Sequence, residues 1–365
     1  MESTDQIIQE RKVDTSETWL WEAYPDAFRK LLVEHSIPER ADKKRHNIIW
    51  ATDSYSNLGD GYGFNDEITP EKIIGEHGML IRPRALKDRD EQIRRVKDKA
   101  EVFTPSWICN AQNNLIDEAW FGRPDVFNRE ITDREGAHTW IPTEGKIKFT
   151  NEIGKRWKDY VRDMRLEITC GEAPYLVSRY DAVSGEPISD LKMRIGLLDR
   201  KLRVVSENTD TSQKWIYWAK TALECTYGYE WQGDNLLLAR EALMLTVLDY
   251  YRAKFGKEMP KQSIPGLAYI ISWNLFQMDG LKYVIPNSCN WESVKSKRKD
   301  FQYKAMFPEF ESSEQNECTA CKTGVGDHIG IASKIRDWKA FHNSSNKKNK
   351  EVTDVTFRSL IKTQR

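Results

Sequence analysis

Three segments of this chain pass from apolar residues into a short turn that carries a carboxylate or a glycine. The segments are Leu166–Leu176, Thr226–Trp231 and Ile264–Phe276 with the Gln277–Leu281 turn that follows it. Their turns carry Glu167 with Gly171, Glu230, and Asp279. A helical segment is expected between each pair, and alternating strands and helices favour a parallel sheet with helices on both faces. The sequence therefore predicts an α/β fold.

The first turn has the composition of a ligand-binding strand end. Gly171 and Ala173 are small enough to let a ligand reach the backbone, and Gly171 can adopt a positive φ without a Cβ clash. In open α/β sheets the crevice beyond the strand ends binds nucleotide-like ligands. A buried turn in an ordinary α/β core is the alternative interpretation, and the turn alone does not separate the two.

Apolar periodicity and capping residues predict the other elements. Helices are expected over Glu17–His35, Asp88–Lys99, Ser106–Trp120, Glu152–Met164, Trp215–Cys225 and Asp234–Tyr251. Short strands are expected over Asn47–Thr52, Met79–Arg82 and Ile329–Trp338, and a last strand or helix over Val352–Ile361. The Gly/Thr-rich stretch Asp125–Thr150 is expected to be an irregular flap or ordered loop.

The composition says more about the compartment in which the protein is expected than about its function. Lys+Arg and Asp+Glu each number 56, so net charge gives no argument for nucleic-acid binding, although local basic patches remain possible. There is no run of about 18 apolar residues, so no transmembrane helix is expected. The N-terminus is polar and does not resemble a secretory signal. Six scattered cysteines fit a reducing cytoplasm better than a disulfide scaffold, which predicts a cytoplasmic protein without a membrane partner.

A local basic patch occurs in the segment Leu191–Val205. It contains Arg194, Arg200, Lys201 and Arg203. A contact with phosphate is one interpretation of this patch, and a solvated surface is the favoured one.

Four short motifs, in order along the chain, resemble those of one enzyme family. They are Phe103-Thr104-Pro105, Glu167 through Leu176, Tyr229-Glu230-Trp231, and Gln277-Met278-Asp279-Gly280. The set is similar to the class I S-adenosylmethionine-dependent adenine-N6 DNA methyltransferases of restriction–modification systems, especially the modification-subunit type. The resemblance covers about half of the chain. It implies a Rossmann-like methyltransferase sheet with helices on both faces, an N-terminal mainly helical region and a C-terminal extension.

The resemblance also implies roles for individual residues in binding S-adenosylmethionine. The methionine end would be touched by Phe103, Thr104 and Pro105 and wrapped by Glu167, Cys170, Gly171, Glu172, Ala173 and Tyr175. The ribose would be held by Glu230 and Trp231, and the adenine amino group by Asp279 and Gly280. Ala173 departs from the family, which usually has a second glycine there.

The catalytic motif of that family is missing from this sequence. It consists of a polar residue, two prolines and an aromatic residue, whereas none of the 13 prolines here is adjacent to another. The nearest substitute is Asp337-Trp338, in which Asp337 could accept a hydrogen bond from an amine and Trp338 could stack on an extruded base. An edge strand with an ordinary Asp and a packed Trp is the favoured alternative.

The resemblance therefore leaves two functions open. One is a DNA adenine-N6 methyltransferase of a restriction–modification or phage-defence system. The other is a catalytically incomplete subunit that binds cofactor or DNA and needs a partner. DNA is the implied partner in both, with a specificity subunit or a second modification subunit as a further one. Methylation of RNA or of a small molecule is a weaker third option.

The cysteines suggest a metal site. Cys318 and Cys321 form a Cys-x-x-Cys pair, and Cys289 and His328 could complete the four ligands that structural zinc requires. A reduced pair of surface thiols is the favoured alternative.

The linear organisation predicted from these features has four parts. Residues 1–16 are expected to be a disordered tail and 17–125 an N-terminal helical region ending in the Phe-Thr-Pro element. Residues 126–290 would form the S-adenosylmethionine-binding core, and 291–365 a C-terminal extension with a zinc knuckle.

Overall fold

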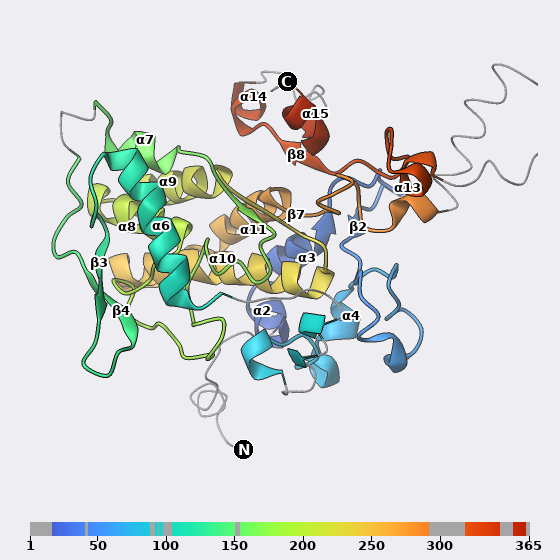
Figure 1. Cartoon of the computed structure of the whole chain (residues 1–365), viewed down its shortest axis with the longest axis horizontal. Helices are drawn as coiled ribbons and strands as arrows, with labels where there is room; N and C mark the ends of the chain where they lie inside the picture. Colours follow the sequence, from blue (N-terminus) through green and yellow to red (C-terminus); the bar gives the residue numbers. More distant parts are fainter. Residues whose placement is uncertain are drawn as a thin grey trace, which may run out of the picture. The chain divides into compact units, whose positions relative to one another are not determined.

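The computed structural model of the chain describes residues 17–40, 43–87, 92–93, 95–97, 104–149, 154–291, 318–343 and 353–362 (Figure 1). It is a mixed helix and sheet structure, 46% helical. The described residues divide into two compact units. Unit 1 lies within Met1–Leu32, Thr69–Gly228 and Asp234–Leu275, and unit 2 within Val33–Ile68, Tyr229–Gly233 and Phe276–Arg365.

Unit 1 contains most of the helices. Its α-helices are α2 (Glu17–Ala23), α3 (Pro25–Leu32), α4 (Pro70–Ile73), α6 (Ser106–Phe121), α7 (Trp157–Val161), α8 (Leu197–Asn208), α9 (Ser212–Glu224), α10 (Gly233–Phe255) and α11 (Ile264–Asn274). Short 3-10 helices are η2 (Gly75–His77), η3 (Arg84–Leu86) and η5 (Lys261–Ser263). An antiparallel hairpin is formed by β3 (Asn128–Thr132) and β4 (His138–Pro142).

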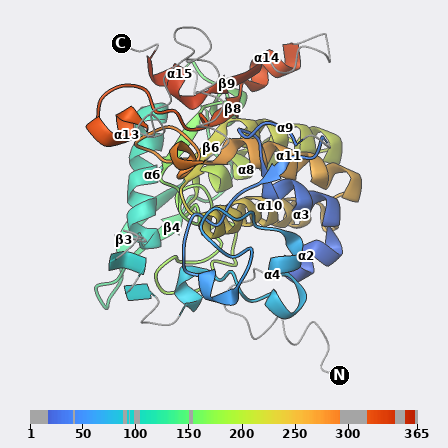
Figure 2. The same cartoon turned by 90° about the vertical axis from the view of Figure 1, so that its right-hand side faces the viewer.

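The helices α3 and α11 pack together in unit 1, and α10 lies beside them (Figure 1 and Figure 2). The buried guanidinium of Arg240 on α10 holds them: its Nη1 donates to the carbonyl of Leu31, and its Nη2 donates to those of Ser272 at 3.1 Å and Leu275 at 2.7 Å. These are carbonyls at helix C-termini, which have no partner inside the helix. One arginine therefore satisfies the ends of both α3 and α11.

A parallel three-stranded sheet joins segments far apart in sequence. Its order is β5 (Arg165–Ile168), β6 (Thr226–Glu230) and β7 (Leu275–Gln277). Helices α8 and α9 connect β5 to β6, and helices α10 and α11 connect β6 to β7. The predicted alternation of strands and helices and the parallel sheet are thus confirmed.

Unit 2 consists of short elements and loops. It contains β1 (Val33–Glu34), β2 (His46–Asn47), η1 (Ser56–Leu58), η6 (Ser288–Asn290), α13 (Thr319–Thr323), β8 (Lys334–Arg336), α14 (Trp338–Asn343), β9 (Asp354–Thr356) and α15 (Phe357–Lys362). The pairs β1–β2 and β8–β9 are antiparallel. The side-chain amide of Gln277 forms with the Ile49 backbone the two hydrogen bonds that a neighbouring strand would otherwise form. Its Oε1 accepts from the Ile49 N–H at 2.9 Å, and its Nε2 donates to the Ile49 carbonyl at 2.8 Å.

Several predicted elements agree with the structure. The helices expected over Ser106–Trp120, Trp215–Cys225 and Asp234–Tyr251 are α6, α9 and α10. The expected strand over Ile329–Trp338 is present in part as β8, and the C-terminal segment forms both a strand, β9, and a helix, α15. The N-terminal tail and most of the helix expected over Asp88–Lys99 lie outside the described residues.

Other predictions were wrong in ways that local chemistry explains. The helix expected over Glu17–His35 is split into α2 and α3, because Pro25 lacks an N–H and disfavours helical geometry at the preceding residue. Met79–Arg82 forms turns rather than a strand, since it is confined between Gly78 and Pro83. The stretch Asp125–Thr150 contains the β3–β4 hairpin, whose turn has Gly136 at φ 87°.

Within the described part of the chain, no helix combines the length and the hydropathy that crossing a bilayer requires.

Candidate functional site

The turn that follows β5 is tightly folded and partly buried. Gly171 and Ala173 both have positive φ, 52° and 63°, and the Ala173 N–H donates to the Cys170 carbonyl at 2.6 Å. Ala173 thus occupies a conformation that glycine adopts more easily. A Cβ on Gly228 of β6 would lie 3.0 Å from the Cys170 Cβ, so β6 approaches the turn closely at this glycine and a larger residue would have to push the Cys170 side chain aside.

Glu172 connects this turn to two other segments of unit 1. Its Oε1 accepts from the backbone N–H of Arg84 at 2.6 Å, and its Oε2 accepts from the Tyr180 hydroxyl at 2.5 Å. Burial raises the pKa of Tyr180 well above its usual value, and the charge of Glu172 adds to the shift. Both carboxylate oxygens therefore hold the turn in place.

Three further residues of the predicted methionine subsite gather in unit 1. The Tyr175 N–H donates to Glu167 Oε1 at 3.4 Å. The pKa of Tyr175 is raised, chiefly by burial and also by the charge of Glu167, while a hydrogen bond with Thr104 lowers it. Pro105 directly precedes α6, as predicted, and Phe103 lies outside the described residues. The structure thus brings Thr104, Glu167 and Tyr175 together.

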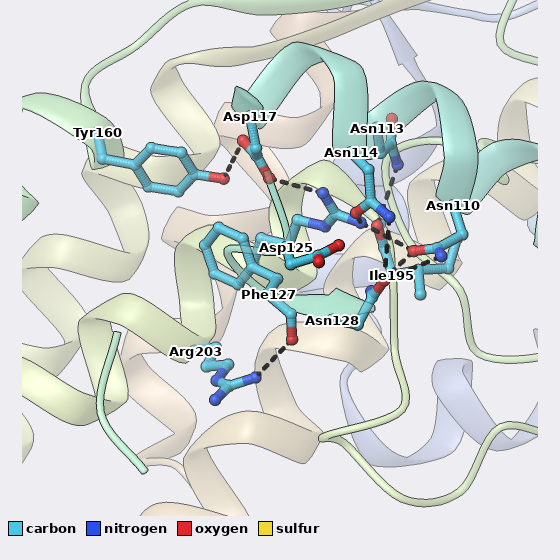
Figure 3. Close-up of polar contacts among 12 residues, drawn as sticks. Asn110, Asn113, Asn114, Asp117, Asp125, Phe127, Asn128, Tyr160, Ile195 and Arg203 are labelled. Atoms are coloured by element: carbon cyan, nitrogen blue, oxygen red, sulfur yellow. Dashed lines mark hydrogen bonds and ion pairs between the residues drawn. The ribbon is translucent and has the colours of Figure 1, made fainter. Parts of the chain in front are cut away.

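Helix α6 positions the carbonyl of Tyr175. Asn113 Nδ2 donates to the carbonyl of Tyr175 at 3.0 Å. It also donates to the carbonyl of Ile195 at 3.0 Å (Figure 3). The N-terminus of α6 is fixed as well, because the Ser106 N–H donates to Asp181 Oδ2 at 2.7 Å. Sequence analysis did not single out Asn113. The sequence pattern that could have identified it is the polar series Asn110, Asn113, Asn114 and Asp117. Their spacing puts these side chains on one face of α6, and this face is turned toward the interior.

A buried polar network surrounds the same helix, and we call it the α6 network. Its members are Asn110, Asn114 and Asp117 of α6, Asn128, Tyr160 and Arg200. Asp117 accepts from the Tyr160 hydroxyl at 2.8 Å and from Arg200 Nη1 at 2.6 Å (Figure 3). Arg200 Nη2 also donates to Asn110 at 3.0 Å and to Asn114 at 2.8 Å, and Asn110 and Asn128 exchange two hydrogen bonds.

The basic patch within Leu191–Val205 is not the solvated surface that the sequence analysis favoured. Arg194, Arg200 and Lys201 are buried, so the favoured solvated surface was wrong, and the interior position of Arg200 and Lys201 argues equally against a phosphate contact there. Lys201 Nζ donates to the carbonyls of Asp163 at 2.6 Å and Cys225 at 2.8 Å. The partners come from distant segments, which a count of local basic residues cannot reveal.

The predicted ribose and adenine residues belong to unit 2. The backbone N–H of Met278 donates to the Glu230 carbonyl at 3.0 Å, so Glu230 and Asp279 follow neighbouring strand ends. Both are buried, and Glu230 Oε1 accepts from the Gln232 N–H at 3.1 Å. Trp231 Nε1 donates to the Ala51 carbonyl at 3.0 Å.

Asp279 organises the turn that it begins. Its Oδ1 accepts from the N–H groups of Leu281 at 2.9 Å and Lys282 at 3.1 Å, and its Oδ2 lies 3.6 Å from Lys282 Nζ. A Cβ on Gly280 would lie 2.8 Å from the Tyr229 hydroxyl, so only glycine fits without displacing that side chain. The Asp-Gly pair is therefore required by the shape of this turn.

The side chains of the predicted catalytic pair, Asp337 and Trp338, contact residues in and next to α14. Asp337 is exposed, and its Oδ1 accepts from the Ala340 N–H at 2.9 Å in the first turn of α14. Trp338 is 6% exposed and packs against Phe341 and the Arg336 guanidinium. A ring buried to this extent offers little surface for stacking on a base, which agrees with the structural alternative for this pair.

Four predicted metal ligands converge in unit 2. The ligand atoms of Cys289, Cys318, Cys321 and His328 all lie within 4.8 Å of one another, and we call this group the Cys–His cluster. His328 Nδ1 is 3.9 Å from Cys289 Sγ, 3.6 Å from Cys318 Sγ and 3.4 Å from Cys321 Sγ. Tetrahedral zinc, with Zn–S of about 2.3 Å and Zn–N of about 2.05 Å, requires N···S separations of about 3.6 Å. The cluster is therefore compatible with a metal ion.

The surroundings of the Cys–His cluster shift the pKa values of two of its thiols in opposite directions. Burial raises the pKa of Cys289 to about 12, and the neighbouring Cys318 and Cys321 add to the shift. Burial acts in the same direction on Cys318, but hydrogen bonds from the backbone of Ile329 and Cys321 and from His328 outweigh it and lower its pKa to about 6. One thiolate thus forms readily, and a second is opposed by the charge of the first.

No family model, curated protein or solved structure matched this chain. The assignment of function accordingly rests on the residues and their geometry.

Proposed function

We propose that this protein is an S-adenosylmethionine-dependent methyltransferase that acts on the N6 atom of adenine in DNA, within a restriction–modification or phage-defence system. The observation that carries the proposal is the strand order β5-β6-β7. In that order, each strand is followed by one of the turns that the resemblance assigns to cofactor binding. A Rossmann-like methyltransferase sheet is part of this proposal.

Each turn offers chemistry that suits one part of the cofactor. By the resemblance, Thr104, Glu167 and Tyr175 would contact the methionine end. The Glu230 carboxylate can accept two ribose hydroxyls, and Asp279 Oδ2 can accept the exocyclic amine of adenine. The main contribution of the protein to methyl transfer would be to position the sulfonium near the acceptor nitrogen.

A second function is favoured by the contacts of Asp337 and Trp338. Because these residues cap and pack α14, and the sequence lacks the paired prolines, the second proposal is that a partner supplies the catalytic motif. In this case the chain would bind cofactor or DNA as one subunit of a larger enzyme, together with a specificity subunit or a second modification subunit.

Calorimetry with S-adenosylmethionine tests the cofactor site. We expect the full-length protein to bind, and Asp279→Ala to weaken binding by about 1–3 kcal/mol, because hydrogen bonds to a charged group are lost. Asp337→Ala is the matched control and should leave the affinity unchanged. Absence of binding at about 1 mM cofactor would contradict both functions.

A transfer assay with tritiated methyl groups then separates the two functions. Incorporation into mixed DNA by the purified chain would support the transferase. Cofactor binding without incorporation would support the partner-dependent subunit.

We also propose that the Cys–His cluster binds zinc in a structural role. Four protein ligands would fill the coordination sphere of tetrahedral zinc and leave no position for water or substrate, which is the arrangement of structural rather than catalytic zinc. Titration with Co²⁺ should produce the visible absorption of tetrahedral cobalt thiolates in the wild type. Cys318→Ser should reduce this absorption strongly, whereas Cys225→Ser, outside the cluster, should not.

A further inference from the structure

We propose that the metal centre at the Cys–His cluster holds the Asp279 turn in its binding shape and thereby sets the affinity for the adenosine end of the cofactor. This inference rests on the proposed function, because it assigns the Asp279 turn to adenine. It adds a positioning role that reaches from the metal ligands to the cofactor site within unit 2.

The first link joins two metal ligands that are far apart in sequence. Cys289 follows Ser288 in η6, and Ser288 Oγ accepts from the Ile331 N–H at 2.9 Å. A Cβ on Gly330 would lie 2.5 Å from Ser288 Oγ and 3.1 Å from Cys289 Sγ. The segment that follows His328 therefore runs directly against the segment that carries Cys289.

The second link continues along the same two segments. The Ile285 N–H donates to the Ile331 carbonyl at 2.8 Å, and Val284 forms an antiparallel bridge with Ala332. The Ser333 N–H then donates to the Tyr283 carbonyl at 3.1 Å. A short ladder thus leads from the cluster toward the Asp279 turn.

The third link reaches the turn itself. Asp279 and Val284 form an antiparallel bridge in which the Asp279 N–H donates to the Val284 carbonyl at 2.8 Å. The Tyr283 N–H donates back to the Asp279 carbonyl at 2.7 Å, and Ser333 Oγ donates to the Gln277 carbonyl at 3.1 Å. Both ends of the turn are therefore tied to the ladder.

Two features indicate that this ladder needs an external restraint. Tyr283 has a positive φ of 59°, a conformation that costs a bulky residue energy and persists only when the surroundings hold it. Val284 packs in a small buried group with Cys289, Cys318 and Ala320, whereas Ile285 and Met278 belong to other buried groups. Two of the four residues in the group of Val284 are proposed metal ligands, so a bound metal would contribute to its stability.

The experiment compares the zinc-loaded full-length protein with the same protein after chelation and after zinc is restored. Amide hydrogen exchange is the readout that does not depend on the cofactor. We expect exchange over 279–285 and 331–333 to be about tenfold faster or more in the metal-free protein and to return on reloading. Exchange in α10 of unit 1 should not change. Equal exchange over 279–285 in both forms would overturn the inference.

Cofactor affinity provides the second readout. We expect metal removal to weaken S-adenosylmethionine binding by about 5- to 150-fold, and the cofactor to raise zinc affinity by the same factor, because coupling between two sites is reciprocal. Cys321→Ser, which changes the exposed ligand, should reproduce the effect, and Cys225→Ser should not. Equal cofactor affinity with and without metal would overturn the inference.

The two proposals fail in different ways. If the zinc-loaded protein does not bind the cofactor, the proposed function is wrong, and the inference falls with it. Hydrogen exchange would then still decide whether the metal holds the turn. If the loaded protein binds the cofactor and metal removal leaves either readout unchanged, only the further inference is wrong.

Discussion

The α6 network of unit 1 and the Cys–His cluster of unit 2 both bring polar side chains close together, but their charges are balanced differently. In the α6 network the Asp117 carboxylate meets the Arg200 guanidinium, and amides and a hydroxyl satisfy the remaining contacts. In the Cys–His cluster three thiols and an imidazole converge, and the charge of one thiolate opposes the next.

This difference distinguishes a structural network from a ligand site. In the α6 network the Asp117 carboxylate and the Arg200 guanidinium balance each other in charge, and most of the buried polar atoms pair within the protein, with Arg200 Nε as an exception. The Cys–His cluster gathers groups that all prefer the same partner, a soft divalent cation. This shared preference for a cation, rather than burial or polarity, is what supports the proposed metal site at the Cys–His cluster.

The largest expected effect tests whether the α6 network is self-contained. Asp117→Asn leaves the buried Arg200 without its carboxylate, and removing one partner of a buried ion pair costs about 3–5 kcal/mol. Urea denaturation should show this loss of stability. The double variant Asp117→Asn/Arg200→Met should recover part of it, and an unchanged stability in Asp117→Asn would show that the pair is not essential.

The next effect concerns a residue that contacts no metal. Ser288→Ala removes the hydroxyl that accepts from the Ile331 N–H beside the cluster. We expect zinc affinity to fall by about 10- to 100-fold, as is usual when a group that orients metal ligands is lost. Competition with a chromophoric chelator measures this change. Ser206→Ala, in unit 1, is a control that should leave zinc affinity unaltered.

A pH dependence of stability is expected from Lys201. Burial lowers its folded-state pKa from 10.5 to about 7. Between these values the unfolded chain binds a proton that the folded chain has released, so stability rises as pH rises through this window. From pH 7 to 8.5 the gain from this group is about 1.5 kcal/mol. Denaturation of Lys201→Met over the same range should lack this increment, and an identical slope would contradict the assignment.

The smallest effect sharpens the interpretation of Asp337. Asp337→Ala removes the hydrogen bond to the Ala340 N–H and should cost about 1 kcal/mol, the usual contribution of a helix cap. Methyl transfer, where the chain shows it, should not change. A loss of transfer with unchanged cofactor affinity and stability would instead restore Asp337 as a catalytic residue.

Sequence patterns predicted the fold best where helices are long and periodic. The helix α10 has acidic Asp234 in its first turn and basic Arg252 and Lys254 in its last, and it was predicted with nearly correct bounds. The helix and strand within Ile264–Gln277 were harder to separate, because α11 passes into β7 without a loop and both are apolar. Periodicity cannot divide a continuous buried run.

The candidate sites show the same contrast between local and distant information. The Cys-x-x-Cys pair was a local signal, and the addition of Cys289 and His328 predicted the cluster that the structure contains. The burial of Arg200 and Lys201 depends on Asp117, Asp163 and Cys225, which are distant in sequence. No local pattern records such pairings, so the basic patch was misinterpreted as surface.

Measurement of bound zinc tests most directly the central claim that the Cys–His cluster requires a cation and the α6 network does not. Elemental analysis of the purified protein should find about one zinc ion per chain. Cys318→Ser should contain almost none, and Asp117→Asn should retain it. Less than about a tenth of an equivalent in the wild type after supplementation with zinc would contradict the claim.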